Sequence, residues 1–276
     1  MNSKSLASKA QIVRCLCEGN SIRSTSLLCG CAINTVIKLL LEMGTACSKY
    51  QDRELRKLNS MVVQVDEIWS FVGCKQKNAD RDKQAQGQGD VWTWTALDAD
   101  SKLMITWLIG GRGEGYAQSF MFDLAERLNK RIQLSSDGHN AYKNAVKLAF
   151  GANVDYGQII KEYGSDIYAE KRYSPAVCTS VTTKAVVRDP IESQISTSYV
   201  ERSNLTIRMS NRRFTRLTNA FSKKIDNHIA AFSLYAMHYN FCKKHGTVKS
   251  SPAVAAGVTD HIWTVEEMIE TVLKSN

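Results

Sequence analysis

The chain has 276 residues, of which 43% are apolar and 23% are charged, a balance typical of a globular protein with its own core. It contains no uninterrupted apolar run of about 18 residues, the length that a membrane-spanning helix needs. Its first residues lack the apolar stretch and cleavage site of a secretory signal. We therefore expect a cytoplasmic protein with no membrane partner, whose eight cysteines are reduced thiols.

The net charge of +9 is distributed unevenly along the chain. Residues 1–59 hold nine Lys/Arg against four Asp/Glu, residues 60–201 hold sixteen against eighteen, and residues 202–276 hold eleven against five. This pattern favours a polyanion that is held by the flanks and processed in the middle. A merely soluble basic protein is the simpler alternative.

Residues 1–46 predict a small helical domain. After a first helix, a second fits residues 21–29, and a third runs from 32 to 43 and ends at Gly44. The short turn between the last two is typical of a helix-turn-helix. Residues 47–60, rich in charge, are interpreted as a linker. On the third helix we expect these residues to contact double-stranded DNA: Asn34, Thr35 and Lys38.

Residues 61–245 predict an α/β catalytic domain with a mixed sheet. Three β-rich runs that indicate an antiparallel meander are followed by a helix, a short buried strand and a second helix, over residues 61–73, 90–98, 102–110, 116–128, 132–138 and 140–150. Residues 151–198 are interpreted as an insertion of loops and short strands. Helical patterns return over residues 198–209 and 222–244, and residues 246–276 form a C-terminal helical tail whose helix begins near Thr264.

Three carboxylates show the pattern expected of metal-dependent phosphodiester chemistry. Asp66 lies inside the first strand, in VVQVDEIWS, where a carboxylate is costly unless a metal or a partner compensates it. Asp137 ends the short buried strand, and sites form at strand ends in α/β sheets. Glu201 lies early on a later helix, in STSYVERSNLTIR. Carboxylate oxygens suit Mg²⁺, and two such ions can activate the attacking oxygen and stabilise the leaving one.

Each carboxylate also has a simpler explanation. Asp137 could cap the turn that follows it, and Glu201 could be a first-turn glutamate favoured by the helix dipole. Glu67 and Asp98 are reserve candidates, but Glu67 should face away from Asp66 on a strand, and Asp98 fits a hairpin turn. The order of Asp, Asp and Glu along the chain is what favours a metal site.

Four runs of this sequence resemble bacterial insertion-sequence transposases of the insertion sequence one type: QVDEIWSFVG, DVWTWTALDAD, SSDGHNAY and STSYVERSNLTIRMSNRRFTRLTNAFSKK. The resemblance spans residues 10–262. It implies an RNase H-like core with a mixed five-stranded sheet and flanking helices, and a DDE triad at Asp66, Asp137 and Glu201. Here 63 residues separate the last two, an interval longer than in many DDE enzymes, and the insertion over 151–198 would account for it.

The resemblance implies a DNA transposase that binds the terminal inverted repeats of an element and catalyses strand cleavage and strand transfer with Mg²⁺, for which Mn²⁺ can substitute. It also implies a homo-oligomer, because two element ends must be brought together. Two alternatives stay open. One is an RNase H-like metal nuclease or resolvase that does not join DNA, and the other is a non-enzymatic helix-turn-helix regulator.

Basic residues follow Glu201 without an intervening acid before Ile225. We expect them to hold DNA phosphates beside the metals: Arg202, Arg208, Arg212, Arg213, Arg216, Lys223 and Lys224. Arg208 should share a helix face with Glu201, although a solvated arginine is the alternative. His139 is a candidate accessory residue or a solvated turn histidine. Four tryptophans could stack on bases, but sheet packing is the favoured interpretation for Trp69, Trp92, Trp94 and Trp107.

Members of this family often carry an N-terminal zinc finger, and this chain departs from that pattern. Its candidate ligands form two C-x-C pairs, Cys15 with Cys17 and Cys29 with Cys31, whereas structural zinc usually uses C-x₂₋₄-C pairs. On a helix, neighbours two apart point to different sides, and a small thiol fits a core position well. Zinc is therefore not expected.

Overall fold

The computed structural model describes residues 4–164, 177–216 and 218–275. Its centre is one sheet of six strands in the order β3-β2-β1-β4-β5-β6, and these are β1 Val62–Val72, β2 Gly89–Asp98, β3 Met104–Gly110, β4 Ile132–Asp137, β5 Val154–Tyr163 and β6 Cys178–Val187. The β1–β4 and β4–β5 pairs are parallel, and the other neighbours are antiparallel. The predicted mixed α/β class and the antiparallel meander of the first three strands are confirmed.

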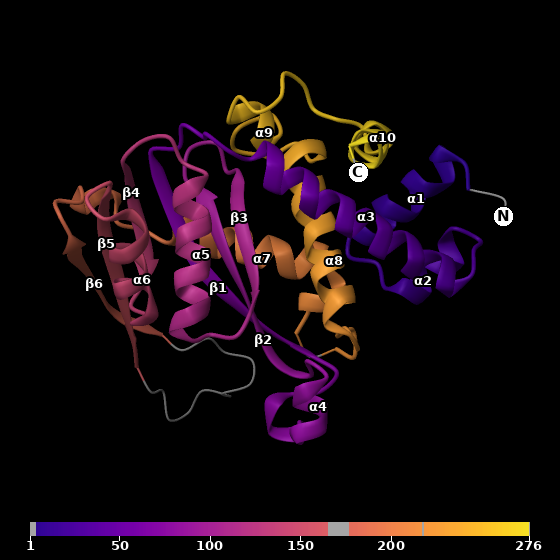
Figure 1. Ribbon diagram of the computed structural model, residues 1–276, viewed down its shortest axis with the longest axis horizontal. Coiled ribbons are helices and arrows are strands. Elements are labelled where there is room, and N and C mark those ends of the chain that lie inside the picture. Colours follow the sequence, from indigo (N-terminus) through magenta and orange to yellow (C-terminus); the bar gives the residue numbers. More distant parts are fainter. Residues whose placement is uncertain (1–3, 165–176, 217, 276) are drawn as a thin grey trace.

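Helices cover both faces of this sheet (Figure 1). On one face lie α5 (Glu114–Glu126) and α6 (Ala141–Phe150), and on the other lie α7 (Ser198–Ser210) and α8 (Ile225–Met237), which continues as a π-helical turn, His238–Cys242. Shorter elements are α4 (Arg81–Ala85), α9 (Pro252–Ala255) and the 3-10 turns η1 (Gln76–Asn78), η2 (Glu192–Gln194) and η3 (Arg212–Phe214).

Alternation along β1 decides which layer each of its side chains meets. Trp94 of β2 lies opposite Glu67 in the register and packs on Tyr142 of α6, with ring centroids 5.4 Å apart. Ile68, the next residue of β1, instead joins a core with residues of α7 and α8. Over residues 63–68 of β1, odd-numbered side chains therefore face α5 and α6, and even-numbered ones, Asp66 included, face α7 and α8.

The parallel pairing between β1 and β4 is short. It joins Val62–Gln64 to Gln133–Ser135, and in the described part of the chain β4 makes no further pair with β1. Beyond Gln64 this edge of β1 is open until Val72, which forms an isolated bridge with Ser222. The last residues of β4 and the middle of β1 thus present side chains at the same open edge.

Three helices precede the sheet: α1 (Leu6–Cys17), α2 (Ile22–Leu28) and α3 (Ile33–Glu54). Ser21 caps α2 by accepting a hydrogen bond from the Ser24 amide. Arg14 of α1 pairs with Glu266 of the C-terminal helix α10 (Val265–Lys274), so the first and the last helix lie side by side (Figure 1). The start of α10 at Thr264, which closes a capping box with Glu267, is confirmed.

No single helix in the described residues has the length and apolar character needed to cross a bilayer. Only α2 and α3 taken together reach that composition, and they are bent by 112° with respect to each other. In α3, apolar residues of this segment are buried inside the protein, among them Val36, Leu40 and Met43.

The expected end of the third helix at Gly44 is wrong, because α3 continues to Glu54. Most of the region interpreted as a linker, residues 47–60, is therefore helical. Packing explains the difference: a Cβ on Gly44 would lie 2.5 Å from the Cα of Ala230 in α8. Ser233 Oγ also donates a 2.7 Å hydrogen bond to the Gly44 carbonyl. This glycine lets two helices approach closely instead of ending one of them.

The expected count of five strands is also wrong. Within residues 151–198, β5 and β6 form an antiparallel hairpin of two ten-residue strands, and β6 is the sixth strand. Most residues of β6 are exposed, so no buried face imposes the alternation by which a strand is recognised. Residues 165–176 of the expected insertion lie outside the described residues.

Gly44→Ala should destabilise the protein by about 1–3 kcal/mol, the usual cost of overpacking, since the new Cβ meets backbone atoms of Ala230. Urea unfolding followed by circular dichroism measures the change. Gly115→Ala in α5 is the matched control, because a Cβ there meets nothing within 4 Å, and it should be neutral or slightly stabilising. Equal effects of the two substitutions would contradict a close α3–α8 contact.

Candidate metal centre

β1 carries two adjacent carboxylates that face opposite sides of the sheet, as strand alternation predicts. Asp66 faces α7, where Asn204 Nδ2 donates a 2.6 Å hydrogen bond to Asp66 Oδ2. Glu67 faces α6, where the Tyr142 hydroxyl donates to Glu67 Oε2 over 3.1 Å and Arg112 Nε donates to Oε1 over 3.0 Å. The Glu67 side chain is only 1% exposed, so these two donors compensate a carboxylate that water scarcely reaches.

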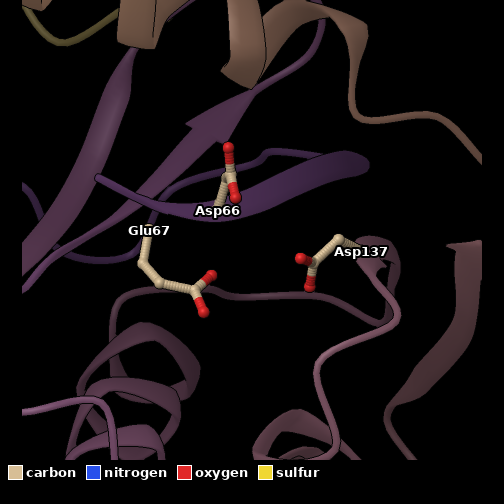
Figure 2. Close-up of side chains that lie close together, drawn as sticks. All are labelled: Asp66, Glu67 and Asp137. Carbon is tan, nitrogen blue, oxygen red and sulfur yellow. The ribbon is translucent and has the colours of Figure 1, made fainter. Parts of the chain in front are cut away.

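Asp137 joins the two carboxylates into one group. It ends β4 and caps the turn that follows, since its Oδ1 accepts a 2.9 Å hydrogen bond from the His139 amide. One oxygen from each of Asp66, Glu67 and Asp137 lies within 4.8 Å of the others. Figure 2 shows the carboxylates of Glu67 and Asp137 pointing toward each other, with Asp66 on β1 above the gap between them. This group could hold a metal ion.

The three carboxylates repel one another in a place with little water. Burial, followed by the charges of Glu67 and Asp137, raises the pKa of Asp66 to about 7. Burial and the charge of Asp137 also raise the pKa of Glu67, against the opposing effect of Arg112. A divalent cation placed among them would favour the ionised form of each carboxyl group.

The chemistry of the donor atoms fits a hard cation. The three carboxylates offer only oxygen, which suits Mg²⁺ or Mn²⁺ better than metals that prefer nitrogen or sulfur. Asn204 adds a buried amide oxygen, Oδ1, which has no hydrogen-bond partner among the described residues. An unpaired buried acceptor is costly, and a hydrated cation beside Asp66 would supply the missing partner.

Glu201 lies beside this group without being part of it. It stands one helical turn before Asn204 on α7, and its charge is a minor contributor to the raised pKa of Asp66. Its carboxylate accepts a 2.6 Å hydrogen bond from Thr197 Oγ1 and pairs with the Lys161 ammonium of β5. The structure therefore brings together two members of the expected triad, with Glu67 as the third carboxylate in place of Glu201.

Asn204 is the site residue that the sequence reasoning missed, and Glu67 is one that it named only as a reserve candidate. Strand alternation removes Glu67 from consideration because it describes the direction of Cβ, whereas the longer glutamate side chain brings its carboxylate back toward Asp137. Asn204 follows Glu201 by three residues, so the helical period places both on one face of α7. That spacing was the available signal for Asn204.

His139 borders the carboxylates but is not among them. Its Nε2 lies 3.3 Å from the Arg112 carbonyl oxygen and 3.7 Å from Glu67 Oε1. Its ring also packs against Trp94, with centroids 6.0 Å apart. His139 is thus held by neighbours of the site, and its accessory role stays a prediction.

The residues expected to contact DNA lie on three parts of the molecule. The first turns of α3 carry an exposed or half-exposed set, Asn34, Thr35 and Lys38. The others lie on α7 and in the segment that leads to α8: Arg202, Arg208, Arg212, Arg213, Arg216, Lys223 and Lys224. Arg208 is half-buried, and its Nε has no partner among the described residues. Burial and the charge of Arg216 lower the pKa of Arg208, and the charge of Asp66 opposes them. Arg208 therefore lies on the Asp66 side of α7.

The N-terminal cysteines are all free thiols. The sulfur atoms of Cys15 and Cys29 lie 3.9 Å apart, and burial, Cys15 and then Cys31 raise the pKa of Cys29 to about 11. Cys17 is buried elsewhere, with its thiol against the Leu234 carbonyl. Members of each C-x-C pair thus have different surroundings, as helical geometry predicts for Cys15 and Cys17.

No protein-family model matches the chain, and comparison with the curated proteins gives no match. The family resemblance therefore rests on the sequence motifs quoted above.

Asp66→Asn should stabilise the metal-free protein at pH 8 and should lose this effect at pH 4. The folded-state pKa of Asp66 is raised to about 7 from 3.8, so wild-type stability falls as pH rises through that window, and asparagine does not titrate. We expect the substitution to raise the free energy of unfolding by about 1–3 kcal/mol at pH 8, after allowance for the partial exposure of Asp66. Urea unfolding in a chelator measures it. The exposed Asp82→Asn serves as control, and a pH-independent difference would contradict the expectation.

Lys161→Met should strengthen binding of Mn²⁺ to the DNA-free protein by about two- to fivefold, the equivalent of one partly exposed ion pair. The reason is that a cation using Glu201 must compete with the Lys161 ammonium that pairs with it. Isothermal titration calorimetry measures the affinity. The double variant Lys161→Met/Glu201→Gln should show no gain, and an unchanged affinity in Lys161→Met alone would remove Glu201 from the ligands of the DNA-free protein.

Proposed function

We propose that this protein is a DDE-type DNA transposase, which binds the ends of an insertion element and catalyses metal-dependent cleavage and strand transfer. The observation that carries the proposal is the convergence of Asp66 and Asp137 from two neighbouring parallel strands. Opposite them, one face of α7 carries Glu201, Asn204 and Arg208. Acidic ligands and a cationic group therefore meet at one edge of the sheet.

The strand order supports an RNase H-like assignment of the core. An antiparallel meander, β1 to β3, is followed by β4 and β5, which extend the sheet in parallel on the other side of β1. In this assignment β6, which pairs with β5 as the second strand of a long hairpin, is an addition to the five-stranded core. It would account for the long interval between Asp137 and Glu201.

The proposed mechanism assigns a role to each group at the site. Asp66, Asp137 and Glu201 would hold Mg²⁺, or Mn²⁺ in its place, which would activate the attacking hydroxyl and stabilise the leaving oxygen. Asn204 holds one oxygen of Asp66 and leaves the other directed to the site. Lys161 must release Glu201 for it to act as a ligand, and a DNA phosphate is a suitable new partner for the ammonium.

The basic flanks would position the DNA. Arg208 faces Asp66 and would hold a phosphate next to the reacting bond, and the seven basic residues between Glu201 and Ile225 would extend that contact. The α2–α3 pair would act as a helix-turn-helix, with Asn34, Thr35 and Lys38 reading the element end. Two ends must be joined to one target, so we propose that the protein acts as a homo-oligomer on double-stranded DNA.

Asp137→Asn or Glu201→Gln should abolish nicking and joining of end DNA and leave its binding unchanged or slightly stronger. Changing a residue that only supports a metal ligand already costs about 10- to 100-fold, so loss of a ligand should cost more than about 100-fold. Glu67→Gln should also reduce activity, because Glu67 lies in the carboxylate group. The assay follows plasmid nicking and strand transfer with Mg²⁺ and the flanking inverted repeats.

Asp82→Asn on the exposed helix α4 is the matched control and should keep full activity. A wild-type protein that nicks but never joins DNA would make the chain a nuclease. A Glu201→Gln protein that cleaves at the wild-type rate would remove the third carboxylate from the proposal.

A further inference from the structure

Arg213 is a desolvated arginine without a counter-ion. In the described parts of the chain no carboxylate lies within ion-pair distance of it, and its Nε donates a 2.8 Å hydrogen bond to the neutral Ser222 hydroxyl. Desolvation lowers its pKa to about 10. The neighbouring His228 is buried and uncharged at neutral pH, since burial and the charge of Arg213 lower its pKa to about 3. A buried cation among neutral neighbours is costly, and binding an anion would offset that cost.

Arg213 borders a cavity of about 520 Å³, and the described residues that line it include aromatic and basic side chains and no acid. Trp69 and Phe71 form one wall, with ring centroids 5.8 Å apart. The Lys75 ammonium lies over the Trp69 ring, 5.9 Å from its centroid, and the Trp69 side chain is half-buried. Arg216, which is exposed, completes the basic lining. The volume suits one nucleotide and not a duplex.

A second cavity, of about 670 Å³, also borders Arg213. It is lined by Ser21 and Arg23 at the start of α2 and by Arg212 and Lys223, and no acid is among the described residues that line it. A basic path therefore runs from the aromatic cavity to the N-terminal helices.

The aromatic cavity lies on the same strand as the carboxylates. Trp69 follows Asp66 by three residues of β1, about 10 Å at the usual rise per residue. It lies along the part of the strand where β4 no longer pairs and where Val72 meets Ser222. A DNA strand that passes Asp66 along this open edge reaches the cavity within a few nucleotides.

We propose that this cavity binds an unpaired nucleotide of the DNA substrate, with its base against Trp69 and Phe71 and its phosphate on Arg213 and Arg216. Paired bases are stacked inside a duplex and cannot present a face to these rings, whereas an unpaired base of any sequence can. The proposal rests on the proposed function for the nature of the substrate. It adds that the protein distinguishes frayed or single-stranded ends from fully paired ones.

The test compares the affinity of the full-length protein for a blunt duplex and for the same duplex with a few unpaired thymidines. Binding is followed by fluorescence anisotropy in a chelator, so that no cleavage occurs. The wild type should bind the tailed duplex about tenfold more tightly, the usual effect of one stacked base. Trp69→Ala should remove this preference, Trp69→Phe should keep much of it, and Trp107→Phe, on β3, should not change it.

Arg213→Met separates a binding role from a structural one. If Arg213 binds a DNA phosphate, its removal should weaken binding to the tailed duplex. The melting temperature of the free protein should stay unchanged or rise. The proposal would be overturned if the wild type bound both duplexes with equal affinity. It would also be overturned if Trp69→Ala lowered the affinity for both duplexes by the same factor. A lower melting temperature without loss of binding in Arg213→Met would make that arginine structural. A tail preference that persists in a protein unable to join DNA would contradict the proposed function alone.

Discussion

Repulsion among buried carboxylates is the constraint on which the site depends. Asp66 and Glu67 are fixed on a central strand and Asp137 on the end of its neighbour, so none of them can turn to solvent without disturbing the sheet. The protein limits the cost with neutral or cationic donors on both faces, Asn204 on one and Tyr142 and Arg112 on the other. These contacts fix the orientation of the carboxylates but do not cancel their charge, and the raised pKa of Asp66 is the result.

The sheet geometry that creates this repulsion is also what leaves the site accessible. Were β4 paired with β1 along its whole length, the middle of β1 would be covered on both edges. Instead the pairing covers three residues of each strand, and beyond it β1 continues with β2 on its other edge. One face of β1 packs on α8, which is in turn held by α3 through the close contact at Gly44. The N-terminal helices thus contribute to the rigidity of the strand that carries Asp66.

The sequence predicts the parts of this structure that have a buried face. The strands of the meander, α7 and the start of α10 follow from periodicity and capping, because each has an apolar side or a defined end. It does not predict β6, whose residues are mostly exposed, or the continuation of α3 through Gly44, which depends on a contact with Ala230 far along the chain. At the site, Asp66 and Asp137 follow from their strand positions. The carboxylate of Glu67 does not, because side-chain length outweighs Cβ direction there.

The molecule has two unbalanced charges of opposite sign along one edge of β1. At Asp66 the carboxylates exceed the cations near them, and at Arg213, further along the same edge, a cation has no carboxylate partner among the described residues. An intramolecular ion pair would have removed both costs, yet Lys161 neutralises only Glu201. A divalent ion alone would balance the first group, and a phosphate alone the second. Metal-bound DNA balances both at once, because the phosphates on either side of the reacting bond continue along the strand to the next basic group. Under the proposed function, this charge distribution would therefore favour binding of the metal and the nucleic acid together over binding of either alone.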